Sequence, residues 1–233
     1  MGSKANFLVD TLKEEEARNL FMKIAGVGEE QPDLQSLAFQ VAKKCEGLLV
    51  AIVTVANALK DKPDSEWRIA LRELSNPPFL ENVEGSVVNK AYGCIHLSYK
   101  RLESEELMST FLLCCIMGCT DDVSIEVLLI YAVGLSLFHE ENTIEEVRDK
   151  VRKMVRKLKD CSLLLGIPNG ETFSIHDVIR DVGGPTINNV FPSRWVGENT
   201  LENCTSITLH DIAELSKPLR CPNLKFFYMK TVH

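Results

Sequence analysis

The feature that most constrains the fold is a helical repeat of apolar residues near the start of the chain. In "PDLQSLAFQVAKKC" (32–45) the apolar side chains recur with the i, i+3, i+4, i+7, i+8, i+11 spacing that puts them on one face of a helix. Pro32 and Asp33 mark the start of the pattern, and Gly47 ends or kinks it. The stretch therefore predicts an amphipathic helix, which needs other elements to cover its apolar face.

Three neighbouring segments have helical patterns of their own. Residues 12–26 and 65–75 each carry one apolar face, whereas "LLVAIVTVANALK" (48–60) is apolar nearly all round, as expected of a central buried helix. The prolines of "NPPF" end the last of these helices. Four helices with short connections predict a compact helical bundle over residues 1–78.

The next part of the chain carries further helix signals. Ser104 precedes an apolar helical stretch, and "SIEVLLIYAVGLSLF" (124–138) predicts a second helix that is buried. Thr143 and Glu146 have the spacing of a capping box ahead of a third helix. These signals predict a second helical region.

A hairpin signal follows the third helix. Two β-rich runs flank Pro168-Asn169-Gly170, so residues 162–176 are expected to form an antiparallel hairpin. The stretch "FSIHDVIRDV" (173–182) then leads from a strand directly into a helix. Helices, a hairpin wing and a further helix suggest a winged-helix domain over residues 79–190.

The composition changes towards the end of the sequence. Two β-like runs, "CTSITLHDIAEL" (204–215) and "CPNLKFFYMK" (221–230), each follow a Cys-led polar start. This resembles the opening of a leucine-rich repeat array. The predicted fold is therefore mainly α: a four-helix bundle (1–78), a winged-helix domain with a β-hairpin (79–190) and the start of leucine-rich repeats (191–233).

His176 and Asp177 stand at the junction of the predicted strand and helix. Backbone N–H groups point outward at the start of a helix, so a phosphate could bind there. An aspartate at the same place is also an ordinary helix cap. The junction by itself is compatible with either role.

The overall composition limits the class of protein. The 233 residues carry a net charge of −7 and are 45% hydrophobic, which is typical of a globular protein and not of one that coats nucleic acid. No apolar run reaches the length of about 18 residues that a membrane span needs. The eight cysteines lie mostly in apolar segments, and no secretory signal precedes them. We therefore expect reduced thiols, no metal site and a cytoplasmic protein.

The helix over 148–159 is the clearest basic feature, with seven Lys and Arg side chains between the apolar positions. Winged helices often bind DNA through such a helix. The same pattern also describes a solvated helix face paired with acidic neighbours. Because no aromatic, Asn or Gln side chain lies on the basic face, we expect no nucleic-acid binding.

The sequence lacks the common catalytic motifs. It contains no G-x-x-x-x-G-K-[ST] phosphate loop, no G-x-S-x-G elbow and no H-E-x-x-H zinc motif. We therefore expect no catalytic residues, and the chain is not expected to be an enzyme.

Four motifs in order resemble the second half of the nucleotide-binding region of plant coiled-coil NB-ARC leucine-rich-repeat disease resistance proteins. "FLVDTLKEEEARNLF" (7–21) resembles the segment after the nucleotidase sheet, and "CEGLLVAI" (45–52) resembles C-x-G-L-P-L-A-I. "LSYKRLESEELMSTFLLCCIM" (97–117) resembles the L-S-Y-D-x-L segment, and residues 173–182 resemble the M-H-D motif. The resemblance extends over nearly all of the chain.

The resemblance assigns roles to particular residues. His176 would reach the β-phosphate of bound ADP, Asp177 would orient the junction, and the turn at Gly47 and Leu48 would lie against the nucleotide base. Leu49 replaces the proline of the family motif, so we expect the turn to be less rigid.

The resemblance also implies what the chain is part of. The parent would be an ADP/ATP-controlled switch in plant defence, and the chain would be its C-terminal part without the phosphate-loop domain. It would depend on the missing nucleotidase domain or a related receptor, and alone it would bind ADP or ATP weakly. Its host signalling and effector partners are unknown. The alternatives are a winged-helix nucleic-acid-binding regulator and a nucleotide-independent adapter that pairs with a related receptor.

Overall fold

The computed structural model describes residues 11–76, 87–117, 123–166 and 171–180, together with the backbone of three strands between 189 and 230. The helix that begins at residue 87 is described by its backbone alone over its first three residues. The chain divides into two compact units, Met1–Arg101 and Leu102–His233. Each unit is considered by itself.

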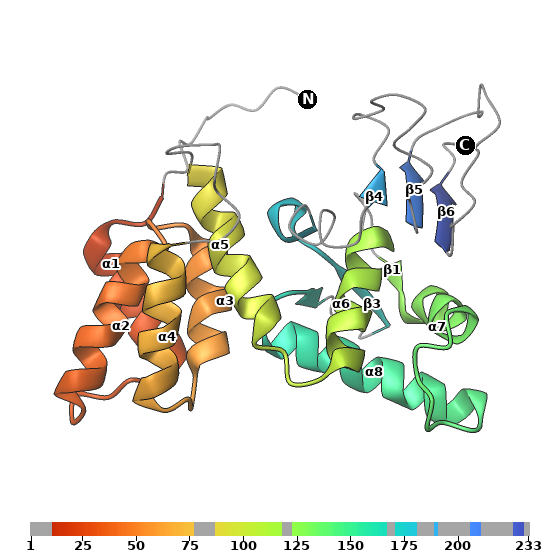
Figure 1. The fold of residues 1–233 in the computed structure, drawn as a ribbon, viewed down its shortest axis with the longest axis horizontal. Coiled ribbons are helices and arrows are strands. Elements are labelled where there is room, and N and C mark those ends of the chain that lie inside the picture. Colours follow the sequence, from red (N-terminus) through yellow and green to blue (C-terminus); the bar gives the residue numbers. More distant parts are fainter. Residues whose placement is uncertain are drawn as a thin grey trace, which may run out of the picture. The chain divides into compact units, whose positions relative to one another are not determined.

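The first unit is a bundle of five helices within the described residues (Figure 1). They are α1 (Glu14–Ala25), α2 (Pro32–Lys44), α3 (Leu49–Leu59), α4 (Asp64–Ser75) and α5 (Val87–Lys100). α1 packs against α2 and α3, and α2 packs against α4. The four helices predicted for this region are therefore present, and α5 adds a fifth against α3 and α4.

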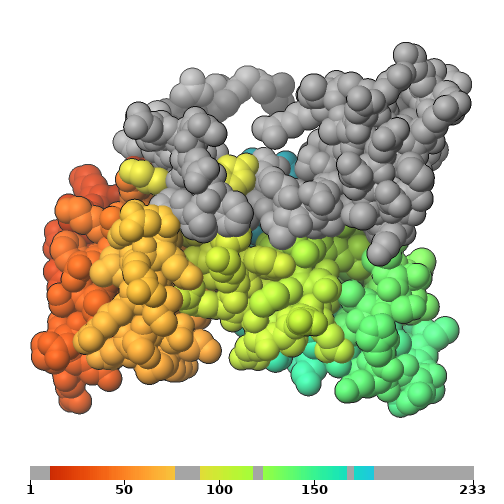
Figure 2. All heavy atoms as spheres, in the orientation of Figure 1, coloured from red at the N-terminus to blue at the C-terminus, as the bar shows by residue number. Residues whose placement is uncertain are grey.

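The core of the bundle explains why these segments are helical. α3 is apolar nearly all round, and the bundle covers most of its sides; Ile52, Val55 and Leu59 have no exposed surface. Phe21 of α1 meets Trp67 of α4 edge to face, with ring centroids 6.0 Å apart. In the space-filling view the atoms of α1–α4, red to orange, form a continuous surface (Figure 2). The burial of the α3 side chains shows that the bundle packs around most of this helix.

The second unit combines helices with a small antiparallel sheet. Its elements are α6 (Glu105–Met117), β1 (Val123–Ser124), α7 (Ile125–Gly134), α8 (Ile144–Asp160), β2 (Leu165–Gly166) and β3 (Thr172–Ser174), followed by a helical turn over 177–180. The strand order is β1-β3-β2, and both pairings are antiparallel. The predicted hairpin is confirmed by the pairing of β2 with β3. Its expected turn at Pro168-Asn169-Gly170 lies outside the described residues.

The predicted helix starts of this unit are confirmed by hydrogen bonds. The Ser104 hydroxyl accepts from the Leu107 N–H at 3.2 Å. Thr143 accepts from the Glu146 N–H at 3.2 Å, and the Glu146 carboxylate accepts from the Thr143 N–H at 3.1 Å, which completes the capping box. These contacts fix where α6 and α8 begin.

The prediction that the α7 segment is buried is wrong for one face. Ile125, Leu128 and Leu129 are buried, but Ile130 is 68% exposed and Val133 is 47% exposed. Among the described elements α7 packs on α8, α6 and β1. These neighbours cover one side only, whereas the bundle surrounds the equally apolar α3.

A second sheet follows, described by its backbone. Its strands are β4 (Asn189–Val190), β5 (Ser206–His210) and β6 (Phe226–Lys230), which lie parallel in sequence order. Asn189 pairs with Ser206, and Ser206 pairs with Phe226, so partners lie 17 and 20 residues apart. Both predicted β-like runs are therefore strands. The division into 1–78, 79–190 and 191–233 remains a prediction.

Candidate functional site

The turn between α2 and α3 has a left-handed backbone at two successive residues, Glu46 (φ 50°) and Gly47 (φ 73°). The Gly47 carbonyl accepts a hydrogen bond from the Leu12 N–H at 2.9 Å. A Cβ atom at Gly47 would lie 2.3 Å from the Leu12 carbonyl oxygen. Only glycine fits this position, because both the dihedral angle and the close approach exclude a side chain.

Leu48 and Leu49 continue from this turn into α3. Leu48 is the N-cap residue, with an extended backbone (φ −72°, ψ 114°), and Leu49 is the first helical residue. An extended residue followed by the first position of a helix is the backbone that a proline at 49 would require. The backbone of the turn is therefore compatible with proline at position 49, although the residue there is Leu49, which is 58% exposed.

His176 and Asp177 lie at the start of the helical turn over 177–180. Phe173, Ile175 and Ile179 around them are buried, while His176 and Asp177 point outward with side chains 46% and 69% exposed. The Asp177 carboxylate accepts from the Val178 N–H at 2.8 Å. That bond joins neighbouring residues. His176 holds the N-cap position, and its Nδ1 also lies 3.3 Å from the Val178 nitrogen, so a capping role for Asp177 stays a prediction.

The contact between the two side chains determines what the imidazole can offer to a ligand. Nδ1 of His176 lies 2.6 Å from Oδ1 of Asp177 and 3.3 Å from the Val178 backbone nitrogen. This ring nitrogen is therefore engaged within the junction, and Nε2 is the ring nitrogen that is left to meet a ligand.

The structure thus brings the predicted site residues together in two groups. Gly47, Leu48 and Leu49 form the start of α3 in the first unit. His176 and Asp177 form the helix start in the second unit.

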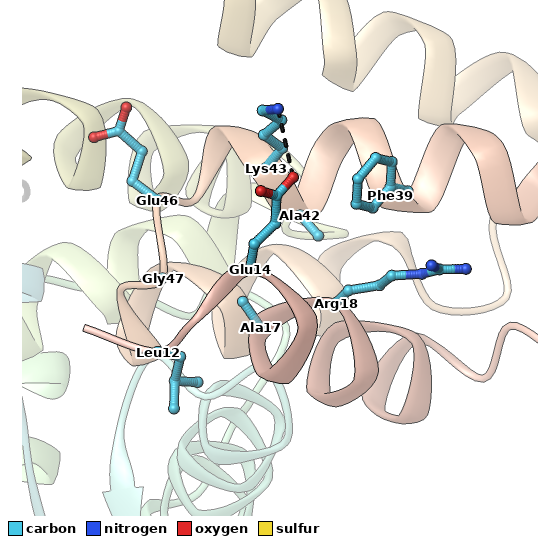
Figure 3. A pocket seen from close by; sticks show the side chains of 9 residues that line it. All are labelled: Leu12, Glu14, Ala17, Arg18, Phe39, Ala42, Lys43, Glu46 and Gly47. Carbon is cyan, nitrogen blue, oxygen red and sulfur yellow. Dashed lines mark ion pairs between the residues drawn. The ribbon is translucent and has the colours of Figure 1, made fainter. Parts of the chain in front are cut away.

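A shallow pocket of about 230 Å³ lies beside the Gly47 turn, between α1 and α2 (Figure 3). Lys43 and Glu14 reach towards each other across it, with Nζ and Oε1 3.4 Å apart. The Arg18 guanidinium lies 5.3 Å from the centre of the Phe39 ring. Sequence reasoning did not single out these lining residues, because their partners lie on another helix. With Glu46, the lining has two acidic and two basic side chains, so it offers no excess positive charge to an anion.

The basic face of α8 is mostly neutralised. Four of its seven cations form ion pairs, at these distances: Arg148 to Glu126 3.0 Å, Lys150 to Glu106 and Glu141 3.0 Å each, Arg152 to Asp149 3.7 Å, and Lys157 to Glu103 2.8 Å. A fifth, Lys159, donates to the Thr172 carbonyl at 3.1 Å. Hydrogen bonds from Lys150 to its two carboxylates raise the pKa of its ammonium. The helix therefore has a solvated face that is paired with acidic neighbours, which was one of the two interpretations of its sequence.

The cysteines of the described residues are free thiols. Burial raises the pKa of Cys114. The pKa of Cys45 is raised well above its usual value, chiefly by its hydrogen bond with Cys94 and then by burial. Such thiols are weak nucleophiles and weak metal ligands. Within the part of the chain that the structure describes, no three His, Cys, Asp or Glu side chains group as a metal site would require.

The chain is similar to disease resistance proteins of Arabidopsis thaliana. It is 30% identical over 183 residues to a probable disease resistance protein, a match that covers 78% of this chain and 19% of the relative. It is 33% identical over 177 residues to a second disease resistance protein, covering 74% of this chain and 17% of the relative. A third, also a probable disease resistance protein, is 28% identical over 185 residues, with 78% and 24% covered. No family model matches the chain.

These relatives define the class of protein to which the chain is related. The chain spans about a fifth of the length of the relatives it matches. It is therefore homologous to one part of plant disease resistance proteins. None of the helices in the described ranges is long and apolar enough to cross a membrane.

Proposed function

We propose that the chain is the ARC-like part of a plant NB-ARC leucine-rich-repeat receptor, which works in full length as an ADP/ATP-controlled switch in defence. The observation that carries the proposal is the similarity to disease resistance proteins over 74–78% of the chain. The four NB-ARC-like motifs occur in the order of the family, and they are the reason for proposing that the switch binds a nucleotide.

The fold is compatible with the proposed subdomains. The bundle of α1–α4 corresponds to the first ARC-like subdomain, and α6–α8 with the antiparallel β2–β3 pair correspond to the winged helix. Three parallel strands whose partners are 17 and 20 residues apart suit the start of a leucine-rich repeat array.

His176 is the proposed contact to the β-phosphate. Its side chain is exposed at a helix start, where backbone N–H groups add positive potential. Nδ1 of His176 lies against the Asp177 carboxylate, which leaves Nε2 for the ligand. A phosphate oxygen would accept a hydrogen bond from the Nε2–H group. This contact would favour the closed, ADP-bound state of the receptor.

The Gly47 turn is the proposed contact to the base. Leu49 is exposed at the start of α3, and its backbone follows the course that the proline of the family motif would require. The start of α3 is thus shaped to present an apolar surface to a flat ring.

The remaining contacts would come from outside this sequence. The 233 residues contain no G-x-x-x-x-G-K-[ST] loop, so the phosphate loop and magnesium would be supplied by the nucleotidase domain of the same receptor or of a related one. The chain itself would not be an enzyme. We place the receptor in the cytoplasm, with host signalling or effector proteins as its partners.

The ion pairs of α8 argue against the nucleic-acid alternative. A helix that binds a phosphate backbone needs free cations, but four of the seven on α8 already form ion pairs with acidic groups of this unit.

The test uses the chain joined to the nucleotidase domain of its parent, which we call the restored receptor. Asp177→Val should cause cell death in leaves without a pathogen, because it frees the His176 ring and weakens the ADP-bound state more than the open one. Asp160→Val, an exposed aspartate of the same unit, is the control and should be silent. The proposal fails if Asp177→Val, expressed at the level of the parent, is no more active than the control.

A further inference from the structure

The turn before α3 contains a residue that its own backbone does not favour. Glu46 has a φ of 50°, a left-handed conformation that is uncommon for a side chain other than glycine or asparagine. Such a residue persists only where its surroundings hold it. Asp61, Ser136 and Ser162 share this conformation, so the contacts of Glu46 itself show how its turn is held.

Two backbone hydrogen bonds give part of this support. The Leu48 N–H donates to the Cys45 carbonyl at 3.0 Å, and the Leu12 N–H donates to the Gly47 carbonyl at 2.9 Å. The Glu46 side chain gives the rest, because its carboxylate forms an ion pair with the Lys90 ammonium of α5. This pair joins the turn to a helix that lies 44 residues further along the chain.

Lys90 is badly placed to serve its own helix. It is the fourth residue of α5, and a cation near the start of a helix is unfavourable in the field of the helix dipole. The first turn of α5 contains no acidic residue to offset it. The ion pair with Glu46, whose side chain is 33% exposed, is the better explanation for a lysine at this position.

We propose that Lys90 is a positioning residue for the Gly47 turn. Its ammonium holds the Glu46 carboxylate, and the turn is thereby fixed from α5 as well as from Leu12. A displacement of α5 would then also displace the start of α3, and with it the surface formed by Leu48 and Leu49. The inference rests on the proposed function only for the role of that surface in nucleotide binding.

Amide hydrogen exchange by NMR on the full 233-residue chain tests the coupling. The reporters are the amides of Leu12 and Leu48, which donate the two hydrogen bonds of the turn. In Lys90→Met both should exchange about twofold to fivefold faster, the range that the loss of an exposed ion pair allows. Lys90→Arg should restore the exchange rates, because it keeps the charge.

Lys43→Met is the matched control. Lys43 forms an ion pair with Glu14 in the same unit, with side chains 66% and 60% exposed, but that pair joins α1 to α2 and leaves Glu46 in place. It should leave the Leu12 and Leu48 rates unchanged. Unchanged rates in Lys90→Met, or an equal acceleration in Lys43→Met, would overturn the positioning role.

The restored receptor separates this inference from the proposed function. If Lys90→Met accelerates exchange in the chain and also weakens ADP binding by the receptor about twofold to fivefold, both stand. If exchange accelerates while ADP affinity stays the same, the positioning role stands and the base-facing role of the turn is wrong.

Discussion

The Gly47 turn and the His176–Asp177 junction both introduce a helix, but backbone groups form the first and exposed side chains form the second. At the turn the backbone carries the structure, through two left-handed residues, a bond from Leu12 and a glycine that no other residue can replace. At the junction the working groups are side chains, 46% and 69% exposed, above a buried anchor of Ile175 and Ile179.

The difference indicates how each region should respond to change. A surface made by constrained backbone is present before a ligand arrives, so damage to it should appear as lost stability. A surface made by exposed side chains is held by few contacts, so it can change its hydrogen bonds when a ligand arrives. Its substitutions should appear in binding and signalling more than in folding.

The largest expected effect is at Gly47. Gly47→Ala should lower the free energy of unfolding by about 3 kcal/mol, because it combines a left-handed alanine with a clash against the Leu12 carbonyl. Gly26→Ala is the matched control: its φ of 72° is nearly the same, but no atom lies within 4 Å of the added Cβ. The control should cost about 1 kcal/mol. Equal losses for the two variants in urea titrations would show that the Leu12 contact is unimportant.

The next effect compares two helix starts in the second unit. Thr143→Ala removes the capping box of α8 and should cost about 1 kcal/mol. Asp177→Ala should cost about 0.3 kcal/mol, because the Val178 N–H also lies 3.3 Å from Nδ1 of His176 and keeps an acceptor there. Urea titrations give both costs. A cost of 1 kcal/mol for Asp177→Ala would make the junction as structural as the α8 cap.

Features with a local signal could be predicted from the sequence. Helix periodicity, the caps at Ser104 and Thr143, and the two β-rich runs around Pro168-Asn169-Gly170 all act within a few residues. The structure confirms the helices, the caps and the strand pairing.

Features that depend on distant partners could not be predicted. Cys94 and Leu97 of α5 belong to the core of the first unit, although an apolar stripe does not say which core it joins. The bond from Leu12 to Gly47 and the ion pair from Lys90 to Glu46 connect residues 35 and 44 positions apart. The exposed face of α7 has the same origin, because its composition matches that of the buried α3 and only the neighbours differ.

A smaller effect is expected when the family's proline is restored in the turn. Leu49→Pro should raise the free energy of unfolding by about 0.5 kcal/mol, because Leu48 is already extended and proline restricts the unfolded chain. Val50→Pro is the control. The residue before it is helical, so the ring would clash and the chain should be destabilised. If Leu49→Pro destabilises the chain, the backbone of the turn is not compatible with proline at position 49.

The smallest effect is expected when ADP and magnesium are added to the chain alone, because each of the two proposed contacts is weak by itself. The junction offers one charge-assisted hydrogen bond, worth about 1.5–3 kcal/mol net. The turn offers an apolar contact at Leu49, and the chain has no glycine-rich phosphate loop. A millimolar complex already requires about 4 kcal/mol, so calorimetry should detect millimolar affinity at best. His176→Ala serves as the control and should change the weak heat little. A micromolar dissociation constant that His176→Ala leaves intact would place the nucleotide away from the junction, and one that it abolishes would make the junction sufficient without the turn.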